Sequence, residues 1–516
     1  MATPQEKLAQ SLEVLKKLQK DKEVNAFKSA EISRVHRERL LKNGFIKEVL
    51  KGWYIPVPPE EKEGDSTSWY TNYWRFCACY LDERFGDTYS ISAEKSLEIH
   101  AGNWTIPQQL IIRTTKNVIS HTRLLYGTSL FTMKSPLPDK ADIIVVEGIR
   151  MLSLPASLIK SSQLMFSKNP NEVRAVLGMI RDSSEILRKL LDGGHSKIAG
   201  RLSGAFRNIG NDRIANDIIK TMKSAGYDVR ENDPLQDLTP IKLSIRSQSP
   251  YVNRIRLMWE SMREIVIDHF PKAPGLPSDQ REYLKLMEDI YLTDAYHSLS
   301  IERYQVTPDL VERVRTGDWD PENNEEDKKQ KDAMAARGYW LAYQRVRESV
   351  KRVLNKENAG IVADEDHSDW YRELFAPSVT AGFIKPSDLA GYRNDQVYIG
   401  KSKHVPLNKN AMRDVMPELF KLLQNEEEAS VRAVLGHFIF VFIHPYMDGN
   451  GRMGRFLMNV MLASGGYPWT VIPVEKRDDY MNALEAASVD QDISKFAGFI
   501  GWLVNEGLIG KPVAKI

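Results

Sequence analysis

Residues 444–455 concentrate side chains that could carry out phosphoryl chemistry, and their sequence is HPYMDGNGRMGR. His444 can titrate near neutral pH and accept a proton. Asp448 offers one hard oxygen of the kind that Mg²⁺ binds beside substrate phosphates. Arg452 and Arg455 are three residues apart, so on a helix they share a face, and arginine makes bidentate contacts with phosphate. Together these groups would equip a protein to transfer part of a nucleoside triphosphate to a hydroxyl.

The segments around this motif predict a helix, an anion-binding turn and a second helix. An apolar run ends at Ile443, and a second helical pattern runs from Arg452 through FLMNVML. Gly449, Asn450 and Gly451 lie between them. A glycine-containing turn that opens a helix directs several backbone N–H groups to one point, and the helix dipole adds to their attraction for anions. The chain has no GxxxxGK[ST] segment, which excludes a Walker A loop.

The same twelve residues resemble the Fic-domain motif HxFx(D/E)GNGRxxR at every defining position except Tyr446, where phenylalanine is usual. The resemblance covers about half of the chain, residues 250–516. It implies a mainly α-helical Fic domain with a small β-hairpin flap. It also implies a Mg²⁺-dependent enzyme that transfers AMP from ATP to a Ser, Thr or Tyr hydroxyl of a target protein. Such an enzyme is also expected to modify itself.

The resemblance assigns a role to each motif residue. His444 would be the general base, and Asp448 would bind Mg²⁺. The residues implied to hold the triphosphate are Gly449, Asn450, Gly451, Arg452, Met453, Gly454 and Arg455. The alternative is a Fic fold that has lost its activity, but every charged position of the motif is intact.

Two flanking segments extend the resemblance. The alternation in GYRNDQVYIG (391–400) predicts a strand, and it resembles the family's flap, which would hold the target peptide as an added strand. The flap residues concerned are Val397, Tyr398, Ile399 and Gly400. An ordinary surface hairpin is the alternative.

The segment YMNALEAAS resembles the adenine-side helix YYxxLEAAN and places Tyr480, Met481 and Ser488 beside the nucleotide. Met481 and Ser488 depart from the family pattern. The departures leave another nucleotide or a phosphocholine group open as the donor.

Residues 298–303, SLSIER, resemble the (S/T)xxxE(G/N) helix of self-inhibited Fic proteins. Ser298 and Glu302 match, whereas Arg303 replaces the usual glycine or asparagine. No basic residue lies three or four positions from Glu302, so its own helix offers no ion pair. Glu302 is instead expected to pair with Arg455 and to displace the γ-phosphate. The resemblance also implies that this glutamate can position water to remove AMP from a target.

Residues 1–60 predict two helices and a hairpin, the order of a winged helix, and resemble the amino-terminal winged helix of abortive-infection-type antitoxins. The basic residues that would contact DNA are Arg34, Arg37, Arg39, Lys47 and Lys51. A solvated helix face or a protein-binding winged helix is the alternative. The corresponding alternative function is a DNA-binding regulator whose Fic domain acts as a nucleotide-dependent or self-modifying switch.

Composition completes the prediction. The 516 residues suggest two to four domains, and we expect three: residues 1–60, an α+β region of unknown role at 61–245, and residues 250–516. The net charge of +2 requires any nucleic-acid surface to be local. Two cysteines, no signal-peptide core and no long apolar run favour a cytoplasmic protein without a membrane span. The mixed-charge segment 320–332 is expected to be a solvated loop or the start of a helix. The resemblances leave room for a homodimer.

Overall fold

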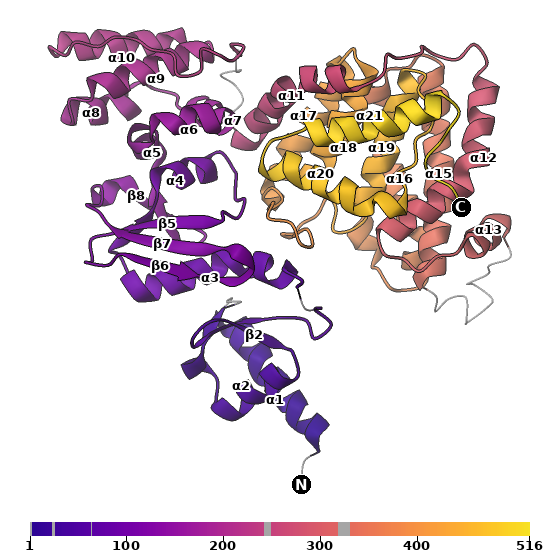
Figure 1. Ribbon diagram of the computed structural model, residues 1–516, viewed down its shortest axis with the longest axis horizontal. Helices are drawn as coiled ribbons and strands as arrows, with labels where there is room; N and C mark the ends of the chain where they lie inside the picture. Colours follow the sequence, from indigo (N-terminus) through magenta and orange to yellow (C-terminus); the bar gives the residue numbers. More distant parts are fainter. Residues whose placement is uncertain (1–2, 23–25, 63, 242–248, 318–330) are drawn as a thin grey trace. The chain divides into compact units, whose positions relative to one another are not determined.

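The computed structural model describes residues 3–22, 26–62, 64–241, 249–317 and 331–516 (Figure 1). Residues 320–330 of the mixed-charge segment 320–332 lie outside these ranges. The chain divides into two compact units. Unit 1 contains residues 1–250 and Tyr398–Val405, and unit 2 contains Tyr251–Val397 and Pro406–Ile516.

The amino-terminal part of unit 1 has the two helices and the hairpin that the sequence predicts, and one further strand. The helices are α1 (Pro4–Lys22) and α2 (Arg34–Lys42), the hairpin strands are β2 (Ile46–Leu50) and β3 (Trp53–Pro56), and the strand that the sequence analysis missed is β1 (Phe27–Lys28). The three strands form an antiparallel sheet in the order β1-β3-β2. Gly44 ends the second helix and Gly52 turns the hairpin, both with positive φ, which glycine adopts without steric cost. The assignment of this part as a winged helix stays a prediction.

The remainder of unit 1 is built on a four-stranded sheet in the order β4-β5-β7-β6. Its strands are β4 (Tyr89–Ile91), β5 (Gln109–Thr114), β6 (Ser120–Arg123) and β7 (Ser129–Lys134). The long aromatic helix α3 (Thr67–Phe85) shares one apolar core with these strands, and Trp69 of that helix donates a hydrogen bond to Thr128 at 3.0 Å. A separate hairpin pairs β8 (Ile143–Val146) with β9 (Ile149–Leu152).

Short helices complete unit 1. They are α4 (Ala93–His100), α5 (Leu154–Lys160), α6 (Gln163–Lys168), α7 (Pro170–Leu177), α8 (Ser184–Asp192), α9 (Ser196–Asn208) and α10 (Asp212–Ser224). The α+β character expected for the middle region is therefore present.

Unit 2 is helical, as expected for the carboxy-terminal region. Its helices are α11 (Pro250–His269), α12 (Gln280–Ile301), α13 (Pro308–Thr316), α15 (Lys331–Leu354), α16 (Ala359–Thr380), α17 (Met412–Asn425), α18 (Ala429–Ile443), α19 (Asn450–Ser464), α20 (Arg477–Val489) and α21 (Ser494–Leu508). The most buried of them, α18 and α19, pack along each other, and α19 also packs on α15 and α16. Within the described ranges, no helix is long and apolar enough to cross a membrane.

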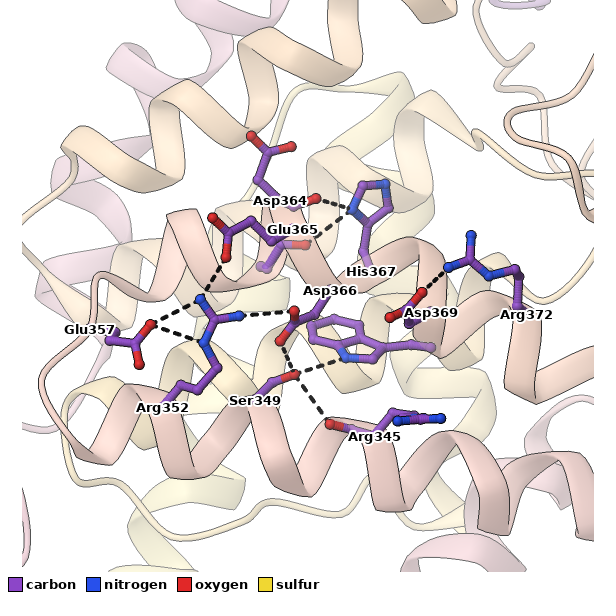
Figure 2. Close-up of polar contacts among 12 residues, drawn as sticks. Arg345, Ser349, Arg352, Glu357, Asp364, Glu365, Asp366, His367, Asp369 and Arg372 are labelled. Atoms are coloured by element: carbon purple, nitrogen blue, oxygen red, sulfur yellow. Dashed lines mark hydrogen bonds and ion pairs between the residues drawn. The ribbon is translucent and has the colours of Figure 1, made fainter.

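A polar network joins α15 to α16, the two helices on which α19 packs (Figure 2). Arg352 of α15 donates to Glu357, Glu365 and Asp366. Ser349, one turn earlier, donates to Asp366 at 2.6 Å. Because each acceptor lies on or just before α16, the network holds the two helices in one register.

Candidate active site

Residues 444–449 form the turn between α18 and α19, and residues 450–455 are the first six residues of α19. His444 follows the last residue of α18 with φ 56° and ψ 61°, and Gly449, φ 81°, precedes the first residue of α19. The side chain of Asn450 closes the turn, since it donates to the Tyr446 carbonyl at 2.8 Å and accepts from the Tyr446 N–H at 2.9 Å. The Asn450 side chain is therefore occupied, and only the backbone N–H of this residue could bind an anion. The first-turn N–H groups of α19 have no partner within the helix and point out of its amino terminus.

His444 is held as a neutral base. Its Nδ1 lies 3.2 Å from the Val441 carbonyl oxygen, so Nδ1 carries the hydrogen and Nε2 keeps its lone pair. Burial lowers the pKa of His444 to about 4, although the Val441 carbonyl favours the charged form. The imidazole is therefore uncharged and able to accept a proton at neutral pH.

Glu302 and Ser298 both bind Arg455, 153 and 157 residues away in the sequence. Arg455 donates through Nε to the Ser298 hydroxyl at 2.8 Å and through Nη2 to the Ser298 carbonyl at 3.0 Å and the Glu302 carboxylate at 2.8 Å. Burial would raise the pKa of Glu302, but Arg455 and Arg452 outweigh it and lower that pKa below its usual range. The ion pair expected from the sequence is present in the geometry.

The carboxylate of Glu302 also lies against the turn itself. A Cβ placed on Gly451 would come within 2.3 Å of the Glu302 Oε1 atom. Gly451 is in the first turn of α19, where an anion would approach the free N–H groups. The carboxylate of Glu302 therefore lies against the amino-terminal turn of α19.

Arg452 lies between two aromatic rings. Its guanidinium is 5.2 Å from the ring centre of Tyr304 and 5.0 Å from that of Phe375, and the side chain is 1% exposed. Three buried guanidinium nitrogens have no hydrogen-bond partner: Nε and Nη1 of Arg452 and Nη1 of Arg455. Buried donors are normally paired, so these atoms indicate that the site takes an anion.

Asp448 is placed as the resemblance requires for a metal ligand. Its side chain is 68% exposed, one carboxylate oxygen accepts the Gly449 N–H at 2.6 Å, and Arg452 lies 3.6 Å away. Mg²⁺ is usually held by one or two carboxylates together with substrate phosphates, and this residue fits that role. The described residues contain no cluster of three metal-ligating side chains.

Arg303 shows why the family pattern has glycine or asparagine at this position. α12 ends at Ile301, Glu302 caps it, and Arg303 takes a left-handed conformation with φ 67°. That turn lets the Tyr304 N–H bond the Leu299 carbonyl at 3.1 Å and brings Tyr304 over Arg452. Arg303, which departs from the family pattern, is therefore a strained residue, and the chain forms the same turn despite that strain.

Arg303→Gly should stabilise the chain by about 1 kcal/mol, because a side chain in the left-handed region costs about 1–2 kcal/mol and glycine loses part of that gain in backbone entropy. The urea midpoint of unit 2, followed by near-UV circular dichroism, measures it. Arg303→Ala keeps the Cβ and should give no gain. An equal gain in both variants would show that backbone strain is not the cause.

Arg393 is the main residue that sequence reasoning missed. This buried arginine donates through Nε to the His444 carbonyl at 2.8 Å, through Nη1 to the Asp395 carbonyl at 2.9 Å, and through Nη2 to the Leu407 carbonyl. Its own N–H donates to the Pro445 carbonyl at 2.8 Å. It holds the backbone of the proposed base, and the only signal in the sequence was an arginine inside GYRNDQVYIG.

The strand predicted for residues 391–400 is wrong. No strand is assigned anywhere from Gly391 to Val405, and a turn closed by the Ser402 N–H and the Ile399 carbonyl joins two irregular arms. The Gln396 side chain links those arms by donating to the Pro406 carbonyl at 2.9 Å. Lys401 has φ 63° in that turn. The alternation around Tyr398 therefore marks a loop that is not assigned to any strand, and its role as a flap stays a prediction.

The helix predicted around YMNALEAAS is α20. Tyr480 is buried, and its hydroxyl lies 2.9 Å from His437 Nε2. Burial raises the pKa of Tyr480 to about 12, and the nearby Arg455 opposes that rise. Met481 is partly buried on the core and Ser488 is 8% exposed. The tyrosine hydroxyl is therefore engaged inside the core, near Arg455.

The basic residues of the amino-terminal part are mostly engaged within unit 1. Arg37 donates to the Ser29 carbonyl at 2.9 Å, and Arg39 donates to the Lys7 carbonyl at 2.7 Å. Lys47 donates to Glu61 and to Tyr126, each at 2.8 Å. Arg34 is exposed but paired with Glu38, and Lys51 is exposed. The predicted DNA-contacting set is thus not presented as one free basic surface.

Comparison with known proteins matches residues 365–462 to the Fic/DOC family. Curated relatives are the Protein adenylyltransferase Fic of Drosophila ananassae and of Drosophila virilis, each 37% identical over 123 residues. That stretch is 23% of this chain and 24% or 25% of the relatives, so the chain spans about a quarter of their length.

Solved structures similar to this chain include Fic-1 from C. elegans, with 16% identity and a TM-score of 0.36 over 68% of this chain and 98% of that one. A Fic family protein from Desulfovibrio desulfuricans has 20% identity and a TM-score of 0.33 over 50% of this chain and 74% of that one. The family match and the geometry of residues 444–455 agree, and residues 365–462 of this chain are a Fic/DOC domain.

Proposed function

We propose that this chain is a self-inhibited protein adenylyltransferase that transfers AMP from ATP to a Ser, Thr or Tyr hydroxyl of a target protein and of itself. The observation that supports this most is the set of three unpartnered guanidinium nitrogens on Arg452 and Arg455. They lie at the amino-terminal end of α19, directly after the turn that carries a neutral His444 and an exposed Asp448. The relatives' name, Protein adenylyltransferase Fic, supports the same reaction.

The reaction follows from the placement of these groups. Arg452, Arg455 and the first N–H groups of α19 hold the triphosphate. Nε2 of His444 takes the proton as the target hydroxyl attacks the α-phosphate. The bond to the β-phosphate breaks, pyrophosphate leaves, and AMP remains on the target. Asp448 would hold Mg²⁺, which neutralises phosphate charge when bound.

Glu302 is proposed to act as the inhibitor of this reaction. Its carboxylate pairs with Arg455 and crowds Gly451, where the phosphates are expected. A phosphate brought to that position would meet a like charge and lose an arginine partner. ATP would then be excluded or held in a pose unsuited to in-line attack.

Incubation of the full chain with labelled ATP and Mg²⁺, in parallel with GTP, CTP, UTP and CDP-choline, tests the proposed donor. We expect label from ATP on the chain, and more of it in Glu302→Gly. Label only from another nucleotide or from CDP-choline would replace AMP transfer by the alternative donor. DNA binding is not proposed, because Arg37, Arg39 and Lys47 are engaged within unit 1.

The pH dependence follows from the lowered pKa of His444. A pKa of about 4 keeps the imidazole neutral above that pH, so its capacity to accept a proton is lost only as the pH falls through about 4. We expect kcat/KM of Glu302→Gly to be flat between about pH 6 and 8 and to fall in acid. A fall centred near the ordinary histidine pKa of about 6.5 would show that the ring is not held neutral.

Arg393→Lys should lower kcat about 10- to 100-fold with little change in nucleotide affinity, because a small displacement of a reacting group has effects of that order. Lysine cannot reproduce the three-directional contact with the carbonyls of His444, Asp395 and Leu407. Single-turnover rates and ATP titrations of the Glu302→Gly background separate the two quantities. Arg345→Lys, at an exposed pair with Glu373, is the matched control. A loss confined to ATP affinity would contradict a positioning role.

A further inference from the structure

A cavity of about 510 Å³ lies within unit 1, and none of its lining residues belongs to the motif site. Its volume is in the range of small-molecule sites. Three cationic side chains line it: Arg113 from β5, Lys160 from the end of α5 and Arg201 from α9. Apolar side chains, among them Ile159 and Ile198, line it as well. Among the described residues that line the cavity there is no carboxylate.

The sheet side of the cavity presents two unsatisfied polar atoms. Ser90 of β4 and Arg113 of β5 are directly paired across the antiparallel strands, so their side chains share one face. Ser90 is 0% exposed, and its hydroxyl has no hydrogen-bond partner. The Nε atom of Arg113 is also buried without a partner. The Ser90 hydroxyl and the Arg113 Nε are thus placed side by side, and no described residue accepts a hydrogen bond from either.

The helix side of the cavity presents a third unsatisfied polar atom. Arg201 stacks on Phe166, 4.7 Å from the ring centre, and donates through Nη2 to the Ser161 carbonyl at 2.9 Å. Its Nε atom is buried without a partner. Burial lowers the pKa of Arg201, and no carboxylate opposes that effect. A cation held in place by an aromatic ring and a neutral carbonyl still lacks its counter-charge.

We propose that this cavity binds a small organic phosphate, with the oxyanion between Arg113 and Arg201 and its carbon skeleton on Ile159 and Ile198. Two guanidinium groups, one of them held by Phe166 and the Ser161 carbonyl, suit the several oxygens and the double charge of a phosphate monoester, as do a lysine and a serine hydroxyl. The first turn of α9, His195 to Ile198, also lines the cavity and adds the positive end of a helix dipole. This site is independent of AMP transfer and gives the middle region a ligand-binding role.

Isothermal titration calorimetry of the full chain tests this with phenyl phosphate as the probe, and with inorganic phosphate and benzyl alcohol as the two halves of that chemistry. Phenyl phosphate should bind, and Arg113→Gln or Arg201→Gln should weaken it about 10- to 100-fold, as the loss of a charge-assisted contact implies. Ser90→Ala, which keeps every charge, should weaken it by a smaller factor. Equal binding of inorganic phosphate would support the oxyanion site and remove the role of the apolar lining.

Two controls separate this cavity from other phosphate sites. Arg123→Gln removes one exposed arginine from β6 of the same sheet and should leave the affinity unchanged. Arg455→Gln damages the motif site and should also leave it unchanged. Binding that is lost in Arg455→Gln but kept in Arg113→Gln would place the ligand at the motif and overturn the proposal. Absence of phenyl phosphate binding to the wild type, or tighter binding of benzyl alcohol, would overturn it as well.

Discussion

His444→Ala in the Glu302→Gly background is expected to lower the rate of AMP transfer about 10²- to 10⁴-fold, the usual contribution of a general base. The residue has no substitute nearby: Asp448 is turned onto the Gly449 N–H, and Glu302 has been removed in this background. The arginines that hold the triphosphate are untouched, so ATP affinity should change little. Single-turnover labelling with saturating ATP measures the rate, and a nucleotide titration measures the affinity.

The left-handed conformation of His444 calls for a second variant. Alanine at φ 56° is strained, whereas asparagine tolerates that region well, so His444→Asn removes the base while easing the backbone. Both variants should be inactive. His269→Ala is a matched control, because His269 also ends a helix and its Nδ1 lies 2.8 Å from the Ile265 carbonyl. Activity retained in His444→Asn would show that the ring is not the base.

Glu302→Gly is expected to raise self-modification about 10- to 100-fold, because a freed Arg455 gains a charge-assisted contact with the γ-phosphate. It also removes the carboxylate that crowds Gly451. ATP should raise the melting temperature of this variant more than that of the wild type, since a ligand stabilises the state it binds. Without ATP the variant should melt lower, because Arg455 loses its ion-pair partner while remaining buried.

Glu302→Gln separates charge from bulk. It keeps the side chain beside Gly451 but removes the negative charge, so its activity should fall between those of wild type and Glu302→Gly. Glu312→Gln, which breaks an ion pair with Arg315 on α13, removes a carboxylate without touching the motif and should match the wild type. Equal labelling of wild type, Glu302→Gly and Glu302→Gln would contradict inhibition by this residue.

Sequence alone predicted the parts of the site that are local in the chain. The turn at Gly449, the two arginines on one face of α19 and the base at the end of α18 follow from glycine placement and helical spacing over twelve residues. The pairing of Glu302 with Arg455 spans 153 residues, and only the family resemblance predicted it. Propensities carry no information about contacts at that separation.

The missed features depend on tertiary packing. Arg393 matters because the turn after α18 and the segment between α16 and α17 bring four backbone carbonyls around it, which no spacing rule encodes. Tyr304 reaches Arg452 only because Arg303 accepts a strained turn. The strand predicted at Val397 failed for the same reason: alternation suits any extended segment, and a ladder needs a partner. The orphaned donors of Arg113 and Arg201 depend on sheet register and on the packing of α9.

Intact mass spectrometry of Glu302→Gly and of the double variant Glu302→Gly, His444→Asn, after incubation with ATP and Mg²⁺, tests AMP transfer by this motif most directly. We expect a gain of one AMP on the single variant and no gain on the double variant. Equal gains on both, or no gain on Glu302→Gly while the chain still binds ATP, would contradict it.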